Sequence, residues 1–385
     1  MLTYATAGES HGPACVALVS GLPAGVPLDL DFINAELARR QGGYGRGARQ
    51  RIETDRIEFL SGVRLGNTTG GPLTAVVRNK DSRLDDLEAT PPVHRPRPGH
   101  ADLAGSLKWL TNDCRETLER ASARETAART AAGVVARCLL RTLGIEVFAF
   151  VRQIGHAATD AHVTAQNWGQ MKALRDASET YCPDSAATEA QCEIIRAAKV
   201  NKDTAGGLVE AHVFGVPPGL GSCVGWDTRL DARLAYAVMS IQAFKCVEIG
   251  LGKACAALPG SHVHDPIEFD AGQRQARNLG FVRPTNHAGG IEGGMTNGMP
   301  IVVRGTMKPI ATLLQGMPSV DLRTKQPERS QYERSDVCAV PAASVVLESV
   351  VGFEVARAVL EKFGGDTLEE VRGGMERFLE MAREV

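Results

Sequence analysis

The longest run of helix-forming residues, 118–143, constrains the fold more than any other feature of the chain. The run is rich in Ala, Leu and Arg, and it holds no Pro and a single Gly. Residues of this kind favour helix, so the run predicts one long helix that Gly144 would end. We expect the rest of the fold to be organised around this helix.

Arg120 and Arg124 would face the same side of that helix. Like charges four residues apart repel each other unless an anion or an acidic partner lies between them. Upstream, the loop 97–102 presents His100 directly after a Pro-Gly pair, which makes the loop rigid. The small residues around the arginines and this histidine favour an anion site. Ion pairs on a solvated helix surface are the alternative explanation.

Hydrophobic periodicity predicts the remaining elements. They are interrupted by a Pro-rich loop at 79–96 and by a polar, partly helical segment at 156–203. The turn Gly-Leu-Pro-Ala-Gly at 21–25 is similar in sequence to a second turn, Gly-Val-Pro-Pro-Gly, at 215–219. Both turns follow an apolar run and precede a helix, which predicts two similar units related by internal pseudo-symmetry. The predicted strands are 14–19, 52–62, 72–77, 145–151, 207–214 and 300–305, and the predicted helices are 29–40, 231–241, 341–363 and 367–383.

Composition limits the classes of partner. The chain has 385 residues, 43% of them hydrophobic, and a formal net charge of −2, which suits a globular protein but predicts no binding to nucleic acid. No apolar run reaches the length of a membrane span and the first residues lack a secretion signal, so we expect a cytoplasmic location. Nine scattered cysteines without a Cys-x-x-Cys pair predict buried thiols and no metal site.

The N-terminal motif Gly-Glu-Ser-His-Gly at 8–12 formally matches the nucleophile elbow of esterases. We reject this interpretation because an elbow needs a buried strand before it and a helix after it, whereas Pro13 follows here. The alternative is a loop that approaches a ligand closely, with His11 as a proton donor and Ser10 as a hydroxyl group.

Two further segments have the composition of anion-binding loops. Residues 39–51 hold five arginines, four glycines and no acid, which describes either a surface loop or a lid that closes on a polyanion. Residues 289–298 are rich in glycine, and Lys308 follows them as a cation that could meet a phosphate. Structural turns explain the glycines equally well, and the ending of a P-loop is absent.

Together these motifs resemble the chorismate synthase family. That resemblance implies an α+β fold in one catalytic domain over residues 1–385, with central helices sandwiched between antiparallel sheets, and a homotetramer. It also implies a reaction, the 1,4-anti elimination of phosphate from 5-enolpyruvylshikimate 3-phosphate to give chorismate, the last common step of the shikimate pathway. The matching segments are 8–12, 39–47, 61–64, 97–102, 122–126, 231–234, 289–298, 308–312 and 333–336.

The resemblance also implies roles for individual residues. His11 would protonate the leaving phosphate, and His100 would keep the reduced FMN cofactor protonated. Asp336, with Ser10, would handle the proton of the flavin N5. The substrate has two carboxylates and a phosphate, so several guanidinium groups must offset its desolvation. These would be Arg40, Arg46, Arg49, Arg97, Arg124 and Arg334.

The flavin contacts implied by the resemblance come from several segments, and NADP is linked to Arg40 and Arg46. Whether NADPH or an external reductant reduces the flavin stays open. Two positions depart from the family pattern, since Ala121 and Gln242 stand where Ser and Asn are expected, and the loop 81–94 is short. The implied flavin contacts are Arg120, Ala121, Ser122, Gln242, Ala243, Gly293, Lys308, Pro309, Ile310, Ala311, Thr312 and Arg334.

Two other functions compete with this one. A flavin-free phosphoryl or acyl transferase would use Ser10 as nucleophile and His11 as base. A polyanion-binding protein would use the arginine-rich segment 39–51, although Tyr44 alone is available there for stacking on bases.

Overall fold

Two antiparallel sheets enclose the central helices. The computed structural model describes residues 1–47, 53–333 and 335–385. In the first sheet the order of strands is β1 (Thr3–Ala7), β2 (Ala14–Ser20), β6 (Leu73–Arg78) and β3 (Ile57–Ser61). In the second it is β10 (Phe244–Ile249), β15 (Ile301–Met307), β9 (Gly207–Phe214), β7 (Glu146–Ile154) and β8 (Ala157–Ala158).

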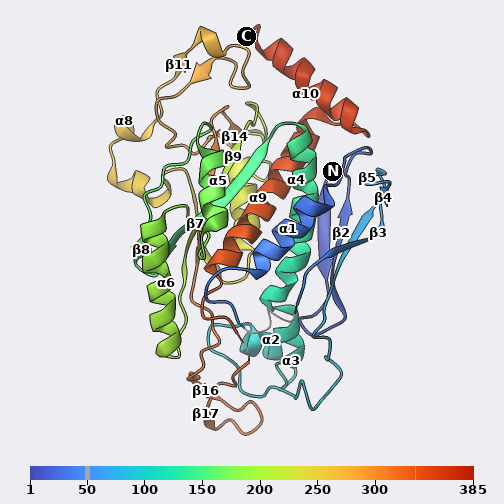
Figure 1. Cartoon of the computed structure of the whole chain (residues 1–385), viewed down its shortest axis with the longest axis vertical. Helices are drawn as coiled ribbons and strands as arrows, with labels where there is room; N and C mark the ends of the chain where they lie inside the picture. Colours follow the sequence, from blue (N-terminus) through green and yellow to red (C-terminus); the bar gives the residue numbers. More distant parts are fainter. Residues whose placement is uncertain (48–52, 334) are drawn as a thin grey trace.

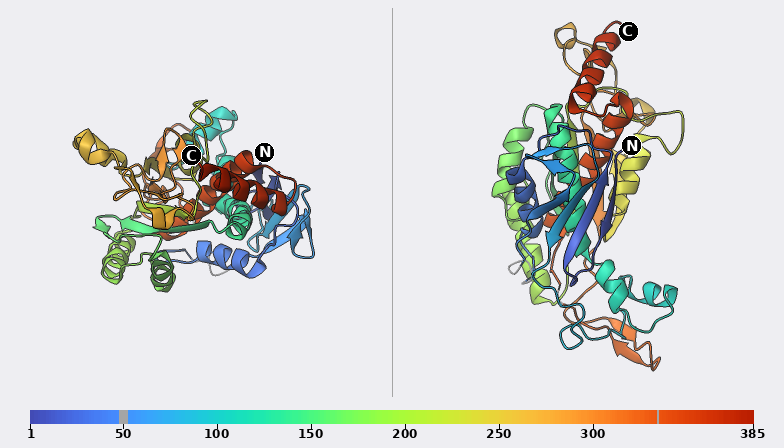
Figure 2. Two further views of the ribbon diagram at one scale, coloured as in Figure 1. Left: turned by 90° about the horizontal axis from the view of Figure 1, so that it is seen from above. Right: turned by 90° about the vertical axis from the view of Figure 1, so that its right-hand side faces the viewer.

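Four helices form the layer between the sheets: α1 (Leu30–Gln41), α4 (Thr126–Thr142), α7 (Leu230–Met239) and α9 (Val340–Phe363). Helix α4 packs on the first sheet, α9 packs on the second, and the two helices pack on each other (Figures 1 and 2). The main hydrophobic core draws on both halves of the chain, from Leu2 to Leu379. The α+β fold with helices between antiparallel sheets is therefore confirmed.

The remaining elements lie around this frame. Helices α2 (Asp102–Lys108) and α3 (Arg115–Arg120) lie at one end with the hairpin β16–β17, and α10 lies at the other (Figure 1). Helices α5 (Trp168–Ala177) and α6 (Ser185–Val200) cover the outside of the second sheet (Figure 2). The other elements are β4 (Val63–Arg64), β5 (Asn67–Thr68), η2 (Ala123–Glu125), η3 (Gly252–Ala257), α8 (Gly260–Val263), β11 (Glu268–Phe269), η4 (Ala271–Gln273), β12 (Phe281–Val282), β13 (Ile291–Glu292), β14 (Met295–Thr296), β16 (Pro318–Val320), β17 (Pro327–Arg329) and α10 (Leu368–Ala382).

The two halves of the chain repeat one topology, as the paired turns predicted. The order β1-β2-β6-β3 in the first sheet corresponds to β7-β9-β15-β10 in the second. The repeat extends to single hydrogen bonds. The hydroxyl of Thr68 donates to the carbonyl of Pro23 and accepts from the backbone N–H of Val26. The hydroxyl of Thr296 donates to Pro217 and accepts from the N–H of Leu220 in the same way. Each threonine fastens a short hairpin to its turn, so the internal pseudo-symmetry is confirmed.

The prediction of one unbroken helix over 118–143 is wrong at its start. Helix α3 ends at Arg120, the short helix η2 follows, and α4 begins only at Thr126. The hydroxyl of Ser122 accepts from the N–H of Arg124 and caps the new turn. Because of this break, Arg120 and Arg124 do not face the same side of one helix. The predicted end is confirmed, since Gly144 has a positive φ directly after α4.

Most other boundaries agree with the sequence to within a few residues. The loop 8–12 joins two antiparallel strands with no helix after it, which supports the rejection of an esterase elbow. The predicted strand 52–62 begins only at Ile57, and residue 52 lies outside the described residues. All nine cysteines are free thiols, most of them buried.

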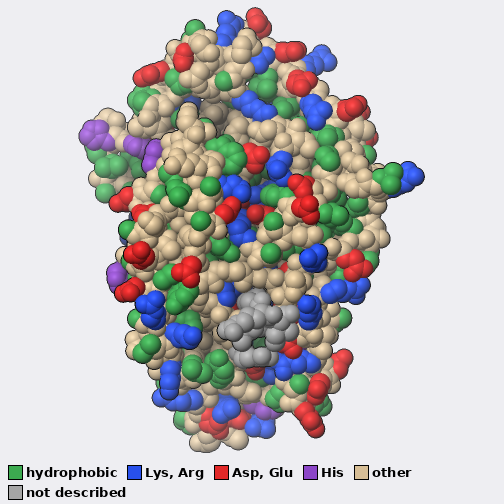
Figure 3. All heavy atoms as spheres, viewed as in Figure 1, with side chains coloured by type: hydrophobic (Ala, Val, Ile, Leu, Met, Phe, Trp, Pro, Cys, Tyr) green, Lys and Arg blue, Asp and Glu red, His purple; other side chains and the backbone are tan. Residues whose placement is uncertain are grey.

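Two further kinds of feature are absent from the described residues. Among the described residues, no helix is both long enough and apolar enough to span a bilayer. The same residues contain no group of three or more acidic, His or Cys side chains suited to hold a metal. Acidic and basic side chains are mixed over the face in Figure 3, with no broad basic patch on it.

The close packing of α4 against α9 depends on Gly133. A Cβ atom at this position would lie 2.3 Å from the carbonyl oxygen of Ser349. We expect Gly133→Ala to lower the free energy of unfolding by about 1–3 kcal/mol, because a close-packed interface must shift to admit the methyl group. Urea unfolding followed by circular dichroism measures the change.

Gly373 in α10 is the matched control, since a Cβ there meets no atom within 4 Å. We expect Gly373→Ala to raise stability by roughly 0.5–1 kcal/mol through helix propensity. Equal effects of the two substitutions would contradict the assignment of Gly133 to a close helix contact.

Candidate functional site

Most of the predicted site residues gather at the end of the molecule where α2 and α3 lie (Figure 1). The loop 8–12 reaches this end between β1 and β2, and the segment after β15 passes beside the loop 97–102. Helices α1 and α4 add residues from their neighbouring ends, through Arg40 and Thr126. Segments distant in sequence thus form one polar region.

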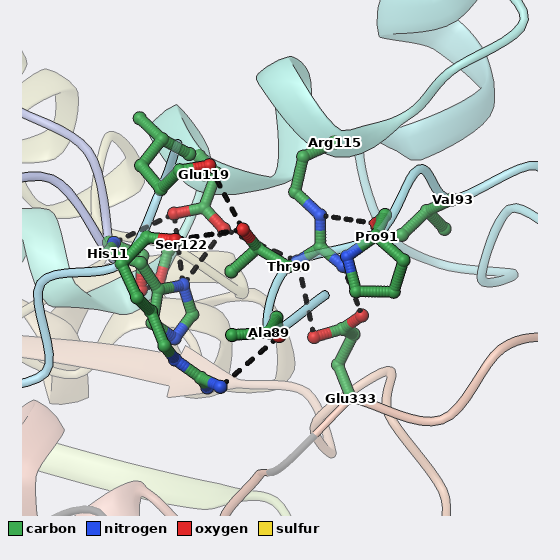
Figure 4. A network of polar contacts seen from close by, with 12 residues as sticks. His11, Ala89, Thr90, Pro91, Val93, Arg115, Glu119, Ser122 and Glu333 are labelled. Carbon is green, nitrogen blue, oxygen red and sulfur yellow. Dashed lines mark hydrogen bonds and ion pairs between the residues drawn. The ribbon is translucent and has the colours of Figure 1, made fainter. Parts of the chain in front are cut away.

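His11 is held by Glu119 of α3 (Figure 4). Its ring Nδ1 lies 2.9 Å from one carboxylate oxygen of Glu119, and its backbone N–H donates to the other at 2.8 Å. Glu119 is 1% exposed. Burial alone would raise the pKa of Glu119, but the hydrogen bonds and charge of His11 outweigh it and lower the pKa. The carboxylate therefore stays ionised against the imidazole.

His100 has an equivalent acidic partner in Asp102, which lies at the start of α2. Arg97 donates to both carboxylate oxygens of Asp102, at 2.8 and 3.0 Å, and also to the hydroxyl of Thr312. Burial of Asp102 would raise its pKa, but hydrogen bonds from His100 and Arg97 hold it well below its usual range. The structure thus joins Arg97 and His100 through one buried acid, and Arg97 in turn binds Thr312.

Arg40 and Arg124 share a third buried carboxylate, Asp55. Arg40 donates to it at 2.6 Å from the last turn of α1, and Arg124 donates to both of its oxygens at 2.7 and 2.9 Å. Arg124 also donates to the side chain of Asn79. Burial would raise the pKa of Asp55, but the charges of the two arginines lower it. Two predicted substrate-binding arginines are therefore fixed side by side.

Arg46 pairs with Asp336, which also accepts from the backbone N–H of Gly47 at 2.6 Å. The described part of the arginine-rich segment is thus not a free surface loop. Its first arginine, Arg39, is in α1 and donates to the buried Glu348. Of the remaining predictions, Arg49 and Arg334 lie outside the described residues, as do residues 48–52, on which much of the proposed lid falls.

The residues predicted to hold flavin fit a polar ligand. Gln242 donates to Glu125 at 2.9 Å, while its side-chain carbonyl is buried and has no hydrogen-bond partner among the described residues. Arg120 anchors to Thr6 of β1. Beside Arg120 and Ala121 is an open hollow of about 380 Å³. The hollow is an open surface depression, and Gln242 is not among the residues that line it. The orphaned carbonyl of Gln242 is a separate polar atom that is available to a ligand donor.

Lys308 supplies a cation at the same end of the molecule. Its Nζ donates to the carbonyl of Gly99 at 2.7 Å, and its backbone N–H donates to Ala243. Burial and the nearby Lys245 lower the pKa of Lys308. Ala243 has a φ of +68°, which is unusual for a residue with a side chain. The segment 308–312, with Pro309, Ile310 and Ala311, therefore lies beside the loop of His100.

Ser10 and Ser122 are hydrogen-bonded to each other, with 3.1 Å between their hydroxyl oxygens. The ring of His11 is bound to Glu119, and its Nε2 lies 3.8 Å from Asp81. These contacts favour a ligand-facing polar loop over a Ser-His nucleophile pair.

Gly293 is the predicted flavin contact that the structure does not bring to this region. It lies in the turn of the β13–β14 hairpin, and the neighbouring Gly294 accepts from Leu230 at the start of α7. Gln242 follows the opposite end of that helix. Ten helical residues span about 15 Å. Within one copy of the chain, Gly293 and Gln242 therefore lie near opposite ends of α7.

Sequence reasoning missed the acids that hold the site together. Asp55 and Glu119 were not predicted, and Asp102 was recognised only as part of a motif. The sequence did indicate that such acids exist, because buried cations in a chain with a net charge near zero need acidic partners. It did not indicate which acids these are. Which acid meets which cation depends on contacts between residues far apart in sequence, 108 residues for His11 and Glu119.

Comparisons with known proteins agree over the length of the chain. The family model described as chorismate synthase matches residues 2–360. Chorismate synthases of Desulforamulus reducens and Pelobacter propionicus are 51% and 52% identical, and each alignment covers 100% of both chains. A crystal structure of chorismate synthase superposes with a TM-score of 0.82 at 39% identity, covering 100% of this chain and 99% of the other.

The shared carboxylate makes Asp55 critical for stability. We expect Asp55→Asn to lower the free energy of unfolding by roughly 3–5 kcal/mol, because it leaves two buried guanidinium groups without their anion. Urea unfolding measures this loss. In the control Glu58→Gln, which breaks an exposed pair with Arg78, we expect less than about 1 kcal/mol. A small loss in Asp55→Asn would contradict the importance of the shared acid.

The depressed pKa values of Asp55, Asp102 and Glu119 predict acid sensitivity. Each contributes stability that is fully present above its unfolded pKa of about 4 and is lost as the pH falls through the lower folded pKa. The free energy of unfolding should therefore decrease as the pH falls from about 5 toward 2. Urea unfolding at each pH tests this, and Asp102→Asn should give a flatter curve. An unchanged curve in that variant would count against the contribution of Asp102.

Proposed function

This chain belongs to the chorismate synthase family, and on that premise we propose that it converts 5-enolpyruvylshikimate 3-phosphate to chorismate with reduced FMN as cofactor. The reaction eliminates phosphate and a C6 hydrogen in 1,4-anti fashion, which makes the enzyme a lyase of the shikimate pathway. The observation that most supports this proposal is the gathering of two imidazoles and four arginines at one end of the molecule, each paired with an acid that is buried or, for Asp336, half-buried.

The charge of the substrate explains the arginines. Its two carboxylates and its phosphate lose water on binding, and planar guanidinium groups replace that hydration with directed hydrogen bonds. Arg40, Arg46, Arg97 and Arg124 would do this, together with Arg49 and Arg334. The acids that hold the described arginines also fix their orientation, which reduces the entropy lost when the substrate binds.

The two histidines would manage protons. His11 would donate a proton to the departing phosphate, because a protonated phosphate is the better leaving group. Although it has no net redox change, the reaction needs bound reduced FMN. His100 would maintain its protonation, and Asp336 with Ser10 would accept or hold the proton at N5. Gln242, Lys308 and the segment 309–312 would hold the cofactor, with Arg120, Ala121, Ser122 and Ala243.

Further properties of the family are part of this proposal. We propose a homotetramer and a cytoplasmic enzyme with one catalytic domain over residues 1–385. Exposed aromatic side chains such as Trp226 and Tyr236 are consistent with subunit contacts. NADPH remains a candidate reductant. Arg40 and Arg46, the candidate NADP contacts, are engaged with Asp55 and Asp336.

An anaerobic assay tests the proposed function. With reduced FMN and 5-enolpyruvylshikimate 3-phosphate, we expect chorismate and inorganic phosphate in equal amounts, detected by absorbance and phosphate assay. His11→Ala and His100→Ala should each lower kcat by roughly 10²- to 10⁴-fold, the usual contribution of a general acid or base. NADPH as sole reductant then shows whether the chain reduces its own flavin.

The competing functions give different results. A flavin-free transferase would need no reduced FMN and would lose all activity in Ser10→Ala. A polyanion-binding protein would bind nucleic acid with an affinity that falls steeply with salt. Either outcome, with no chorismate formed, would overturn the proposal.

A further inference from the structure

Glu119 contacts the loop of His11 at three points. Its backbone carbonyl accepts from the N–H of Ser10 at 3.1 Å. Its two carboxylate oxygens accept from the N–H of His11 at 2.8 Å and lie against the ring Nδ1 at 2.9 Å (Figure 4). The backbone and the imidazole are thus held by one residue, so the ring has little freedom to turn.

The carboxylate also decides which ring nitrogen carries hydrogen. An ionised carboxylate accepts hydrogen bonds and cannot donate them, so Nδ1 must be the protonated nitrogen. The proton that His11 exchanges is then the one on Nε2. Among the described residues, Asp81, 3.8 Å from Nε2, and its ion-pair partner Arg83 are charged groups that lie on that side.

Glu119 is itself fixed from the opposite side by Arg115. This arginine lies one helical turn earlier, 3.4 Å from Glu119, and donates to Glu333 at 3.0 Å and to the carbonyl of Pro91 at 2.9 Å (Figure 4). The side chain of Arg115 is 9% exposed. A chain of contacts therefore links His11 through Glu119 and Arg115 to Glu333. In sequence, residue 333 directly precedes Arg334 and is close to Asp336.

We propose that Glu119 is a positioning residue of the reaction, acting through His11, and that Arg115 and Glu333 hold it in place. The inference rests on the proposed function, in which His11 protonates the leaving group. Glu119 fixes the Nδ1–H form and the ring orientation, so that Nε2 delivers its proton in a single direction. Without it, the imidazole would sample both tautomers and several rotamers.

A double-mutant cycle separates this role from a merely structural one. Chorismate formation is measured with reduced FMN in Glu119→Ala, His11→Ala and the double variant. We expect Glu119→Ala to lower kcat by about 10²-fold with KM changed less than about threefold, and to have little further effect once His11 is absent. If the fold-loss of kcat in the double variant equals the product of the two single losses, the proposal is overturned.

Two variants control for folding. Glu119→Gln keeps the size and one acceptor, so it should lose less stability and less activity than Glu119→Ala. Glu369→Gln changes an exposed acid on α10, at the opposite end of the molecule, and should retain wild-type kcat. If Glu119→Ala does not fold, the cycle is run with Glu119→Gln, and the same non-additivity is expected.

A measurement without substrate or cofactor keeps the two proposals distinct. In the ¹⁵N spectrum of histidine-labelled protein, above the pH at which the ring is charged, His11 should show a protonated Nδ1. Glu119→Ala should shift it toward a mixture of tautomers. A protonated Nε2 in the wild type would overturn the role of Glu119, whatever the activity. Absence of chorismate formation by the wild type would instead reject the proposed function.

Discussion

The pairing of buried cations with buried carboxylates is the interaction on which the candidate site depends. Guanidinium and imidazolium groups removed from water are costly unless an anion lies beside them. Asp55, Asp102 and Glu119 supply such anions, and each is at most 3% exposed. Because an ion pair of this kind must have good geometry to offset desolvation, it also fixes the direction of each cation. A rigid set of donors follows from the same contacts that stabilise it.

Helix α1 links this site to a second set of ion pairs between the central helices. Adjacent residues of α1 illustrate the point, because Arg39 donates to Glu348 of α9 while Arg40 donates to Asp55. Arg39 belongs to a second buried cluster between the helices, made by Glu36, Arg39, Arg137, Arg175 and Glu348. This cluster ties α1, α4, α5 and α9 together next to the site. Movement of one helix would disturb both groups of ion pairs.

The two imidazoles are supported in the same way but from different elements. His11 is oriented by an acid from α3, and His100 by an acid two residues ahead on its own loop. An imidazole next to a carboxylate has a defined tautomer and a defined direction for proton transfer. A reaction that moves protons at two places needs both imidazoles in a defined tautomer and orientation. The acids that orient them are therefore as much a part of the proposed mechanism as the histidines.

The sequence by itself determined most element boundaries and the repeated turns, because these depend on local propensity, hydrophobic period and glycine positions. The fold class came instead from the resemblance of its motifs to a known family. Its motifs also indicated His11, His100 and the arginines. It did not reveal the break at Ser122, since helix propensity favours continuation and the break serves tertiary contacts of Arg120 and Arg124. Nor could it identify Glu119 and Asp55 as partners. Local patterns do not encode which charges meet across the core, and only the packing of helices against sheets decides those pairs.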